Sequence, residues 1–360
     1  MKKFILLLFF VLFFCSGCFD YTELNDMAIV SGISIDYEDD QFQVAFEILN
    51  TSNKEDSQGT SKVYFTKGIG SSISEAFSDA SLEIAKLPYM AHLKTIVINE
   101  EVAKEHVEEI IDFLIRDNHI RNIFYLTIAK DSSAFDIINN FDDNNPVAST
   151  AIANLIDSDI YSNNIAADLN FEKFVVNIID PRKDTYVSSI EIENGVLKLG
   201  PLAIFKSYNM QTYLTEEQSA TFNVLNGDSK EIHFKVNCPN NEENFIVLTT
   251  FNKPKSEVEI EKENVKLKTE VELRMVENHC NLDFKQIETY EEIQKKVEEK
   301  LKKDMQEVME ESLKYQSDIL KIGQTYYQKN KKEIDFTTLN YTYDAKAIIN
   351  RNGLIFEVEQ

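Results

Sequence analysis

The sequence predicts a multi-domain α+β protein with mixed β-sheets, packed helices and a C-terminal meander sheet covered by one long amphipathic helix. Residues 94–130 run strand, helix, strand, which is typical of a mixed or parallel sheet with helical crossovers. Residues 232–276 hold successive strand-like runs, and residues 290–320 carry apolar side chains three or four apart among Glu and Lys. At 360 residues and 43% hydrophobic content, the chain can form two or three cores.

The spacing of apolar residues predicts the elements of the first half. Residues 28–35 and the alternating run 42–48 flank an acidic turn, which is typical of a β-hairpin. The elements predicted after it are a strand at 63–66, a helix at 73–86, a strand at 94–98, a helix at 103–114 and a strand at 124–129.

The second half is predicted in the same way. Its elements are a helical region at 147–179, strands at 187–192 and 196–205, a short helix at 216–225, strands at 232–236, 245–251, 258–260 and 265–276, a long helix at 290–320, and a closing hairpin of 339–349 and 354–358. We expect Gly323 to end the long helix. The apolar stripe of that helix could dock a partner, but we favour the interpretation that it covers its own sheet.

The first residues have the layout of a bacterial lipoprotein signal. Lys2 and Lys3 precede an apolar run, and Cys15-Ser16-Gly17-Cys18 follows it. The thiol of Cys18 would carry a diacylglyceryl group and anchor the mature chain to the outer face of a membrane. The alternative is an ordinary secretory signal followed by a chance cysteine. The predicted divisions are a signal peptide at 1–17, an N-terminal region of two α/β-type subdomains at 18–205 and a C-terminal α+β domain at 206–360.

Composition and motifs exclude several functions. A formal net charge of −24 repels nucleic acid, so no nucleic-acid partner is expected. The histidines are scattered, Gly68-Ile69-Gly70 lacks the remaining residues of a phosphate-binding loop, and no serine lies in a Gly-x-Ser-x-Gly motif. We therefore predict neither a metal site, nor a cofactor, nor catalysis. Beyond the signal, Cys238 and Cys280 could form a disulfide, although two free thiols are the favoured interpretation.

Four blocks, in order along the chain, resemble the Ger(x)C family, the lipoprotein C subunits of bacterial spore germinant receptors. They are Cys18 to Asp36, His92 to Arg121, Ala203-Ile204-Phe205-Lys206 with Tyr213 to Glu217, and Ser317 to Gly323. Phe19 stands where family members usually have tryptophan, and it keeps an aromatic ring.

The resemblance implies three β-rich α+β subdomains, no enzymatic activity, and assembly with membrane A and B subunits. It also implies a position on the outer face of the spore inner membrane. Candidate partner contacts are Glu23, Leu24 and Asn25 behind the anchor, and Arg116 and Arg121 at a predicted helix end. For the arginines, an internal salt bridge or a helix cap is the favoured alternative. For the first three, the alternative is packing onto the first domain.

The main alternative function is capture of a solute for a membrane transporter by a lipid-anchored protein. Such a protein should have two α/β lobes with a cleft between them. The β-rich second half argues against that architecture.

Overall fold

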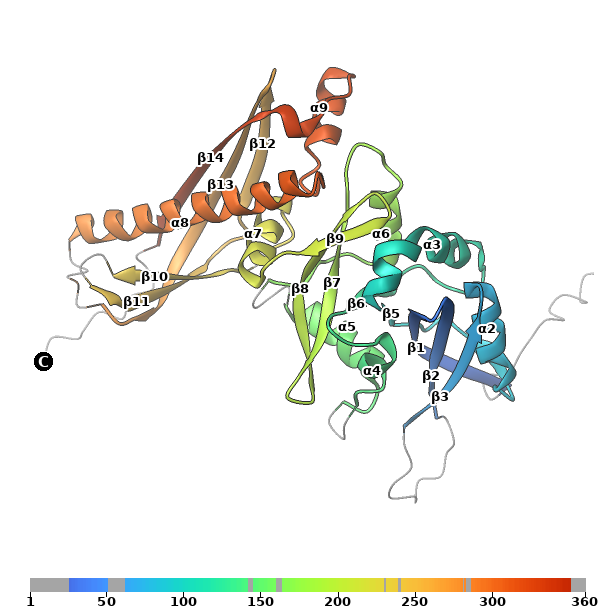
Figure 1. Cartoon of the computed structure of the whole chain (residues 1–360). Helices are drawn as coiled ribbons and strands as arrows, with labels where there is room; N and C mark the ends of the chain where they lie inside the picture. Colours follow the sequence, from blue (N-terminus) through green and yellow to red (C-terminus); the bar gives the residue numbers. More distant parts are fainter. Residues whose placement is uncertain are drawn as a thin grey trace, which may run out of the picture.

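The computed structural model describes residues 26–50, 62–141, 145–159, 164–229, 231–238, 241–280, 282 and 286–350. It contains two sheets with helices packed on them, which confirms the predicted α+β class (Figure 1). Cys18 and the predicted strand 354–358 lie outside the described residues.

The first sheet has nine strands. In chain order they are β1 (Met27–Glu38), β2 (Gln41–Leu49), β3 (Val63–Gly70), β4 (Leu87–Tyr89), β5 (Thr95–Ile98), β6 (Tyr125–Ala129), β7 (Tyr186–Glu193), β8 (Val196–Lys206) and β9 (Asn209–Tyr213). The spatial order is β3-β2-β1-β5-β6-β7-β8-β9, with β4 beside the start of β1. Strands β1, β5, β6 and β7 pair in parallel, as the strand-helix-strand pattern predicts, and the hairpins at both edges are antiparallel. The sheet continues past residue 205 into β9.

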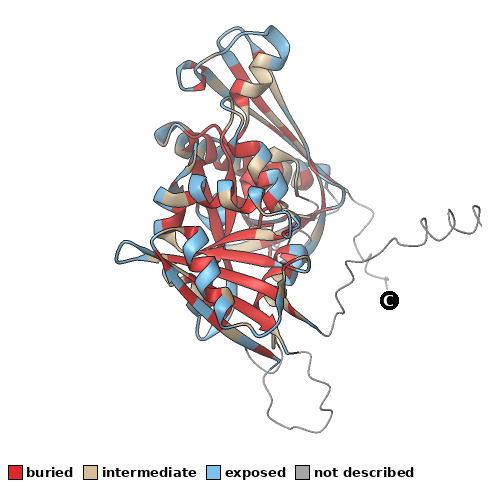
Figure 2. Ribbon diagram, turned by 90° about the vertical axis from the view of Figure 1, so that its right-hand side faces the viewer, coloured by how far each residue is buried: buried red, intermediate tan, exposed pale blue. Residues whose placement is uncertain are grey.

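Helices cover both faces of this sheet. They are α2 (Ile73–Leu82), η2 (Val102–His106), α3 (Val107–Arg116), α4 (Ala134–Ile138), α5 (Ala148–Asp159) and α6 (Phe171–Ile178). Helix α2 lies directly on β3, so close that a Cβ atom at Gly68 would come within 2.2 Å of the Ala76 carbonyl oxygen. This glycine therefore serves close helix–strand packing. Figure 2 shows buried residues concentrated on the strands beneath the helices.

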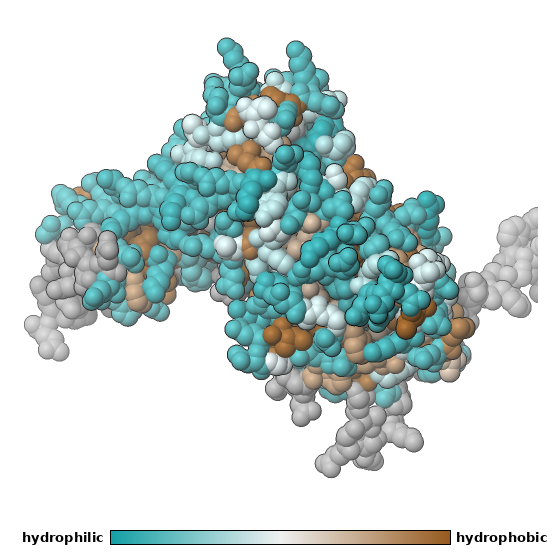
Figure 3. Space-filling view, in the orientation of Figure 1, coloured by the Kyte–Doolittle hydropathy of each residue, from teal (hydrophilic) through white to brown (hydrophobic). Residues whose placement is uncertain are grey.

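The second sheet has five strands and one covering helix. The strands are β10 (His233–Cys238), β11 (Asn241–Thr250), β12 (Lys255–Glu261), β13 (Asn264–Asn278) and β14 (Asn340–Ile349). Strands β11 and β12 pair with successive parts of β13, and β14 pairs in parallel with its other edge. The long helix α8 (Ile287–Lys314) buries its apolar stripe, including Val297 and Leu301, on this sheet. Its visible outer surface is largely hydrophilic (Figure 3), so the stripe covers the helix's own sheet as favoured.

The prediction that the long helix continues to residue 320 is wrong. Helix α8 ends at Lys314, and a separate helix, α9 (Ile322–Asn330), begins after a turn. Gln316 and Lys321 have positive φ values of 52° and 60°, which reverse the chain. Ile319 and Leu320 continue the apolar pattern because they are buried in this turn. Gly323 is therefore the second residue of α9, and a Cβ atom there would lie 3.0 Å from the Arg182 carbonyl oxygen.

The preference for free thiols at Cys238 and Cys280 is also wrong. Cys238 is the last residue of β10, and Cys280 lies two residues after β13. Their Cα atoms are 5.7 Å apart, and the two cysteines form a disulfide. The register of β10, β11 and β13 brings them together.

The remaining helices are α7 (Glu216–Asn226), which links the two sheets, and the short η3 (Phe336–Thr338). Helix α7 has a capping box at Thr215 and Gln218, and Gly227 ends it with φ 76°. It contacts β8 of the first sheet and α8 and β12 of the second (Figure 1). One hydrophobic core therefore runs continuously from the first sheet into the second.

Candidate functional site

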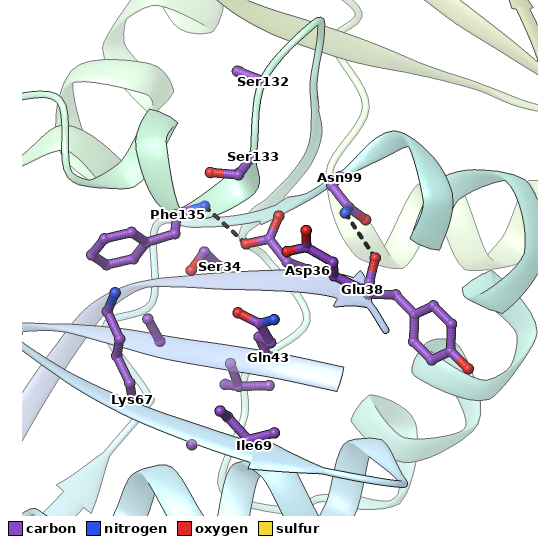
Figure 4. A pocket seen from close by; sticks show the side chains of 14 residues that line it. Ser34, Asp36, Glu38, Gln43, Lys67, Ile69, Asn99, Ser132, Ser133 and Phe135 are labelled. Atoms are coloured by element: carbon purple, nitrogen blue, oxygen red, sulfur yellow. Dashed lines mark hydrogen bonds between the residues drawn. The ribbon is translucent and has the colours of Figure 1, made fainter. Parts of the chain in front are cut away.

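The pairing of β1, β2 and β3 places two polar rows on one face of the first sheet. Asp36 pairs with Gln43, which pairs with Ile69. One row further along, Ser34 pairs with Ala45, which pairs with Lys67. Cross-strand partners share a face, so these side chains project to the side opposite α2. Figure 4 shows them directed toward a common space that the turn before α4 borders.

Asp36 is the buried carboxylate of this face. Its Oδ1 accepts a hydrogen bond from the Ala134 amide at 2.7 Å, and its Oδ2 accepts one from the Phe135 amide at 3.0 Å. It thereby fixes the start of α4 to the end of β1. Burial raises the pKa of Asp36 to about 6, although the two amide hydrogen bonds favour the charged form.

The opposite wall of this space carries a positive charge. The Lys67 Nζ atom lies 3.3 Å from the centre of the Phe135 ring, a cation–π contact. Ser34, at 1% exposure, has a buried hydroxyl without a hydrogen-bond partner among the described residues. With Glu38, Gln43 and Asn99 these groups line a cavity of about 460 Å³, open to solvent on one side. We call this space the Asp36 pocket.

A second carboxylate is buried on the same face without a cationic partner among the described residues. Glu47 lies one row below Ala45, at 0% exposure. It accepts hydrogen bonds from the hydroxyls of Ser31 and Ser149 and from the amides of Ala148 and Ser149 at the start of α5. Burial raises its pKa. Because its acceptors are engaged by these donors, Glu47 serves to hold α5 on the sheet.

A third acidic group lies where the two sheets meet. The Asp184 Oδ2 atom accepts a hydrogen bond from the Asp318 amide at 2.8 Å, and its Oδ1 atom accepts one from Ser207. The Asp318 carboxylate in turn accepts from the amides of Ile322 and Gly323 at 2.9 and 2.7 Å. Burial raises the pKa of Asp318 to about 6. This arrangement, the sheet joint, fixes the turn between α8 and α9 to the first sheet.

Neither of the two predicted contact arginines lines the Asp36 pocket. Arg116, at the end of α3, pairs with Asp112 of the same helix at 2.9 Å, which is the favoured internal salt bridge. Arg121 is exposed in the turn before β6. Glu23, Leu24 and Asn25 lie outside the described residues, as Cys18 does.

Sequence reasoning did not identify the pocket or the joint as sites. Asp36 closes the first family-like block, and Asp318 lies within the fourth, but both look like ordinary turn acids in so acidic a chain. The available signal was local. Asp36 follows the apolar run of the first block, and Asp318 follows Ser317 in the fourth. Asp36 accepts from the Ala134 amide, 98 residues away, which only the fold brings near it. Asp318 accepts from the Ile322 amide, which is 4 residues away.

Neither a metal-binding cluster nor a membrane-spanning helix is present in the described part of the chain. No group of three or more His, Cys, Asp or Glu side chains there is arranged to hold a metal ion. No helix there is long and apolar enough to cross a membrane.

Comparison with known families matches most of the chain. Residues 20–192 match the family described as spore germination protein N-terminal domain, and residues 201–353 match spore germination B3/GerAC-like, C-terminal. The putative spore germination protein YfkR of Bacillus subtilis is 24% identical over 81% of this chain and 78% of its own length. Spore germination protein GerQC of Bacillus cereus is 22% identical over 98% and 99%.

A solved structure supports the same fold. The crystal structure of the GerBC protein aligns with a TM-score of 0.58 at 19% identity, covering 92% of this chain and 99% of that one. Fold and family together define a spore germination protein. The chain belongs to the Ger(x)C family, the C subunits of germinant receptors, as the four sequence blocks indicated.

Proposed function

We propose that this protein is the lipid-anchored C subunit of a spore germinant receptor and supports nutrient-triggered germination by assembling with membrane A and B subunits, without catalysis. The observation that carries the proposal is the pair of family matches, which together cover residues 20–192 and 201–353. The Cys15-Ser16-Gly17-Cys18 motif supports the anchor, on the outer face of the spore inner membrane.

The architecture favours this function over solute capture. Capture between lobes calls for two α/β lobes that close on a ligand. Here the second sheet is mainly antiparallel, and it shares one continuous core with the first. The buried Asp184–Asp318 contact further ties the two parts together.

The test is a Cys18→Ala substitution in the native spore-forming host, with Cys15→Ala as the matched control in the same signal. We expect Cys18→Ala to remove the protein from spore membranes and to abolish germination on the nutrients that the wild type answers. Cys15→Ala should change neither, because an apolar residue remains before the small pair.

Assembly is tested on spore membranes by crosslinking, followed by purification of this chain. A and B subunits should co-purify with the wild type and not with Cys18→Ala. Normal germination of Cys18→Ala spores together with failed uptake of a solute would replace the receptor with a transporter component.

A further inference from the structure

We propose that the Asp36 pocket binds a small zwitterion, a molecule that carries one ammonium and one carboxylate group. Figure 4 shows Lys67 on one side of the space and Asp36 with Glu38 on the other, with Ser34 and Gln43 between them. The proposal goes beyond the proposed function and does not depend on it, because it concerns a pocket built by this chain alone.

The pocket is open because of how the sheet is covered. Helix α4 packs on β1, β5, β6 and β7, and its first residue is fixed by Asp36. The neighbouring strands β2 and β3 keep Gln43 and Lys67 on the same face, where Phe135 of this short helix contacts Lys67. The result is a sheet surface that is walled on one side by the Phe135 ring and accessible from the other.

The charges in the pocket are not neutralised by each other. Within the described residues, no carboxylate lies within 4.0 Å of the Lys67 ammonium, although the chain has 61 acidic and 37 basic residues. An ammonium group without a carboxylate partner in so acidic a protein attracts an anionic group. The unpartnered hydroxyl of Ser34, buried at the floor, adds a hydrogen-bonding group that the protein itself leaves unused.

These charges select the chemistry of the ligand. A purely anionic ligand would gain from Lys67 but would be repelled by Asp36 and Glu38. A purely cationic ligand would meet the opposite conflict. A molecule with both groups can direct its carboxylate to Lys67 and its ammonium to the acidic side. A cavity of about 460 Å³ is within the range of small-molecule sites, and the Phe135 ring and Ile69 supply an apolar wall.

The test measures binding of the common amino acids to the purified chain by isothermal titration calorimetry or ligand-detected NMR. Any amino acid that binds is measured again as its N-acetyl and its carboxamide derivative, each of which removes one charge. We expect saturable binding of at least one amino acid and about tenfold weaker binding of both derivatives.

Two variants locate the binding in the pocket. Lys67→Gln keeps a side chain of similar length on an exposed position, and we expect it to weaken binding by about tenfold or more while leaving thermal unfolding unchanged. Ser34→Ala should weaken binding by a smaller factor. The matched control is Lys62→Gln, an exposed lysine just before β3 and not among the residues that line the pocket, which should bind as the wild type does.

Several results would overturn the proposal. They are no saturable binding of any amino acid at millimolar concentration, equal binding of an N-acetyl derivative, or unchanged affinity in folded Lys67→Gln protein. Binding that is lost in Lys67→Gln, in a protein that proves dispensable for germination, would support the pocket and overturn only the proposed function.

Discussion

The two sheets of this protein bury charge in different ways. The first sheet has helices on both faces, and its central strands are buried almost continuously, as in β1 and β5. The second sheet has α8 on one face, and its strands alternate, as in β10 and β13. In the first sheet Asp36 and Glu47 are buried, and they accept hydrogen bonds from backbone amides or hydroxyls. Acids of the second sheet pair with lysines on an open face, for example Lys266 with Asp344 at 2.8 Å.

This difference shows in which sheet the loss of one charged side chain would lower stability. Substitution of Glu47 in the first sheet would leave buried amides and hydroxyls without a hydrogen-bond acceptor. On the open face of the second sheet, water can replace a partner that a substitution removes. The stability of the first sheet therefore depends on a few buried polar groups. The second depends on its apolar stripe and its disulfide.

The largest effect is expected from Glu47→Ala. It removes the acceptor for the amides of Ala148 and Ser149 and for two hydroxyls, so we expect the free energy of unfolding to fall by about 4 kcal/mol. Urea unfolding followed by circular dichroism measures it. Glu47→Gln, which keeps the volume and one acceptor, should recover part of the loss.

The control for this prediction lies on the second sheet. Lys268 pairs with Glu259 across β12 and β13 at 2.5 Å on the open face. Lys268→Ala should leave the urea midpoint unchanged within error, because exposed pairs contribute little. Equal losses in Glu47→Ala and Lys268→Ala would break the contrast between the two sheets.

The next effect in size is expected from the Cys238–Cys280 disulfide, which closes a segment with a sequence separation of 42. Cys280→Ala should lower the free energy of unfolding by about 3 kcal/mol in the absence of reductant. Dithiothreitol should destabilise the wild type by a similar amount and leave Cys280→Ala unaffected. A wild type indifferent to reductant would mean that the second sheet does not depend on this bond.

The smallest effect is expected from the pH dependence of the sheet joint. The folded state raises the pKa of Asp318 from its ordinary value of 3.8 to about 6, so it binds the proton more tightly than the unfolded chain does. This contribution makes the protein more stable as pH falls from about 6 toward 4, by roughly 2 kcal/mol. Asp318→Asn cannot titrate and should lose this contribution.

The measurement is the difference in unfolding free energy between the wild type and Asp318→Asn at several pH values. The difference should shift in favour of the wild type as the pH is lowered through this window. Any loss of the cap to Ile322 and Gly323 is independent of pH and cancels from the slope. A flat difference would show that Asp318 does not titrate in this range.

The sequence by itself determined the α+β class, most of the strands and helices, the family and the stripe by which α8 covers its sheet. The class, the elements and the stripe depend on local periodicity, which records burial one residue at a time, whereas the family depends on the resemblance of four sequence blocks. It missed β4, β9 and α4, which are short, and it extended the long helix to residue 320 because Ile319 and Leu320 keep the apolar spacing.

Only the tertiary structure decided which acidic side chains are buried and which groups donate hydrogen bonds to them. Asp36 finds the amide of Ala134, and Glu47 that of Ala148, about 100 residues away, through strand pairing and helix placement that leave no periodic trace in sequence. The same holds for the disulfide, since only the register of β10, β11 and β13 brings Cys238 to Cys280. Long-range pairing of polar groups depends on the position of whole elements, whereas apolar spacing reports each element alone.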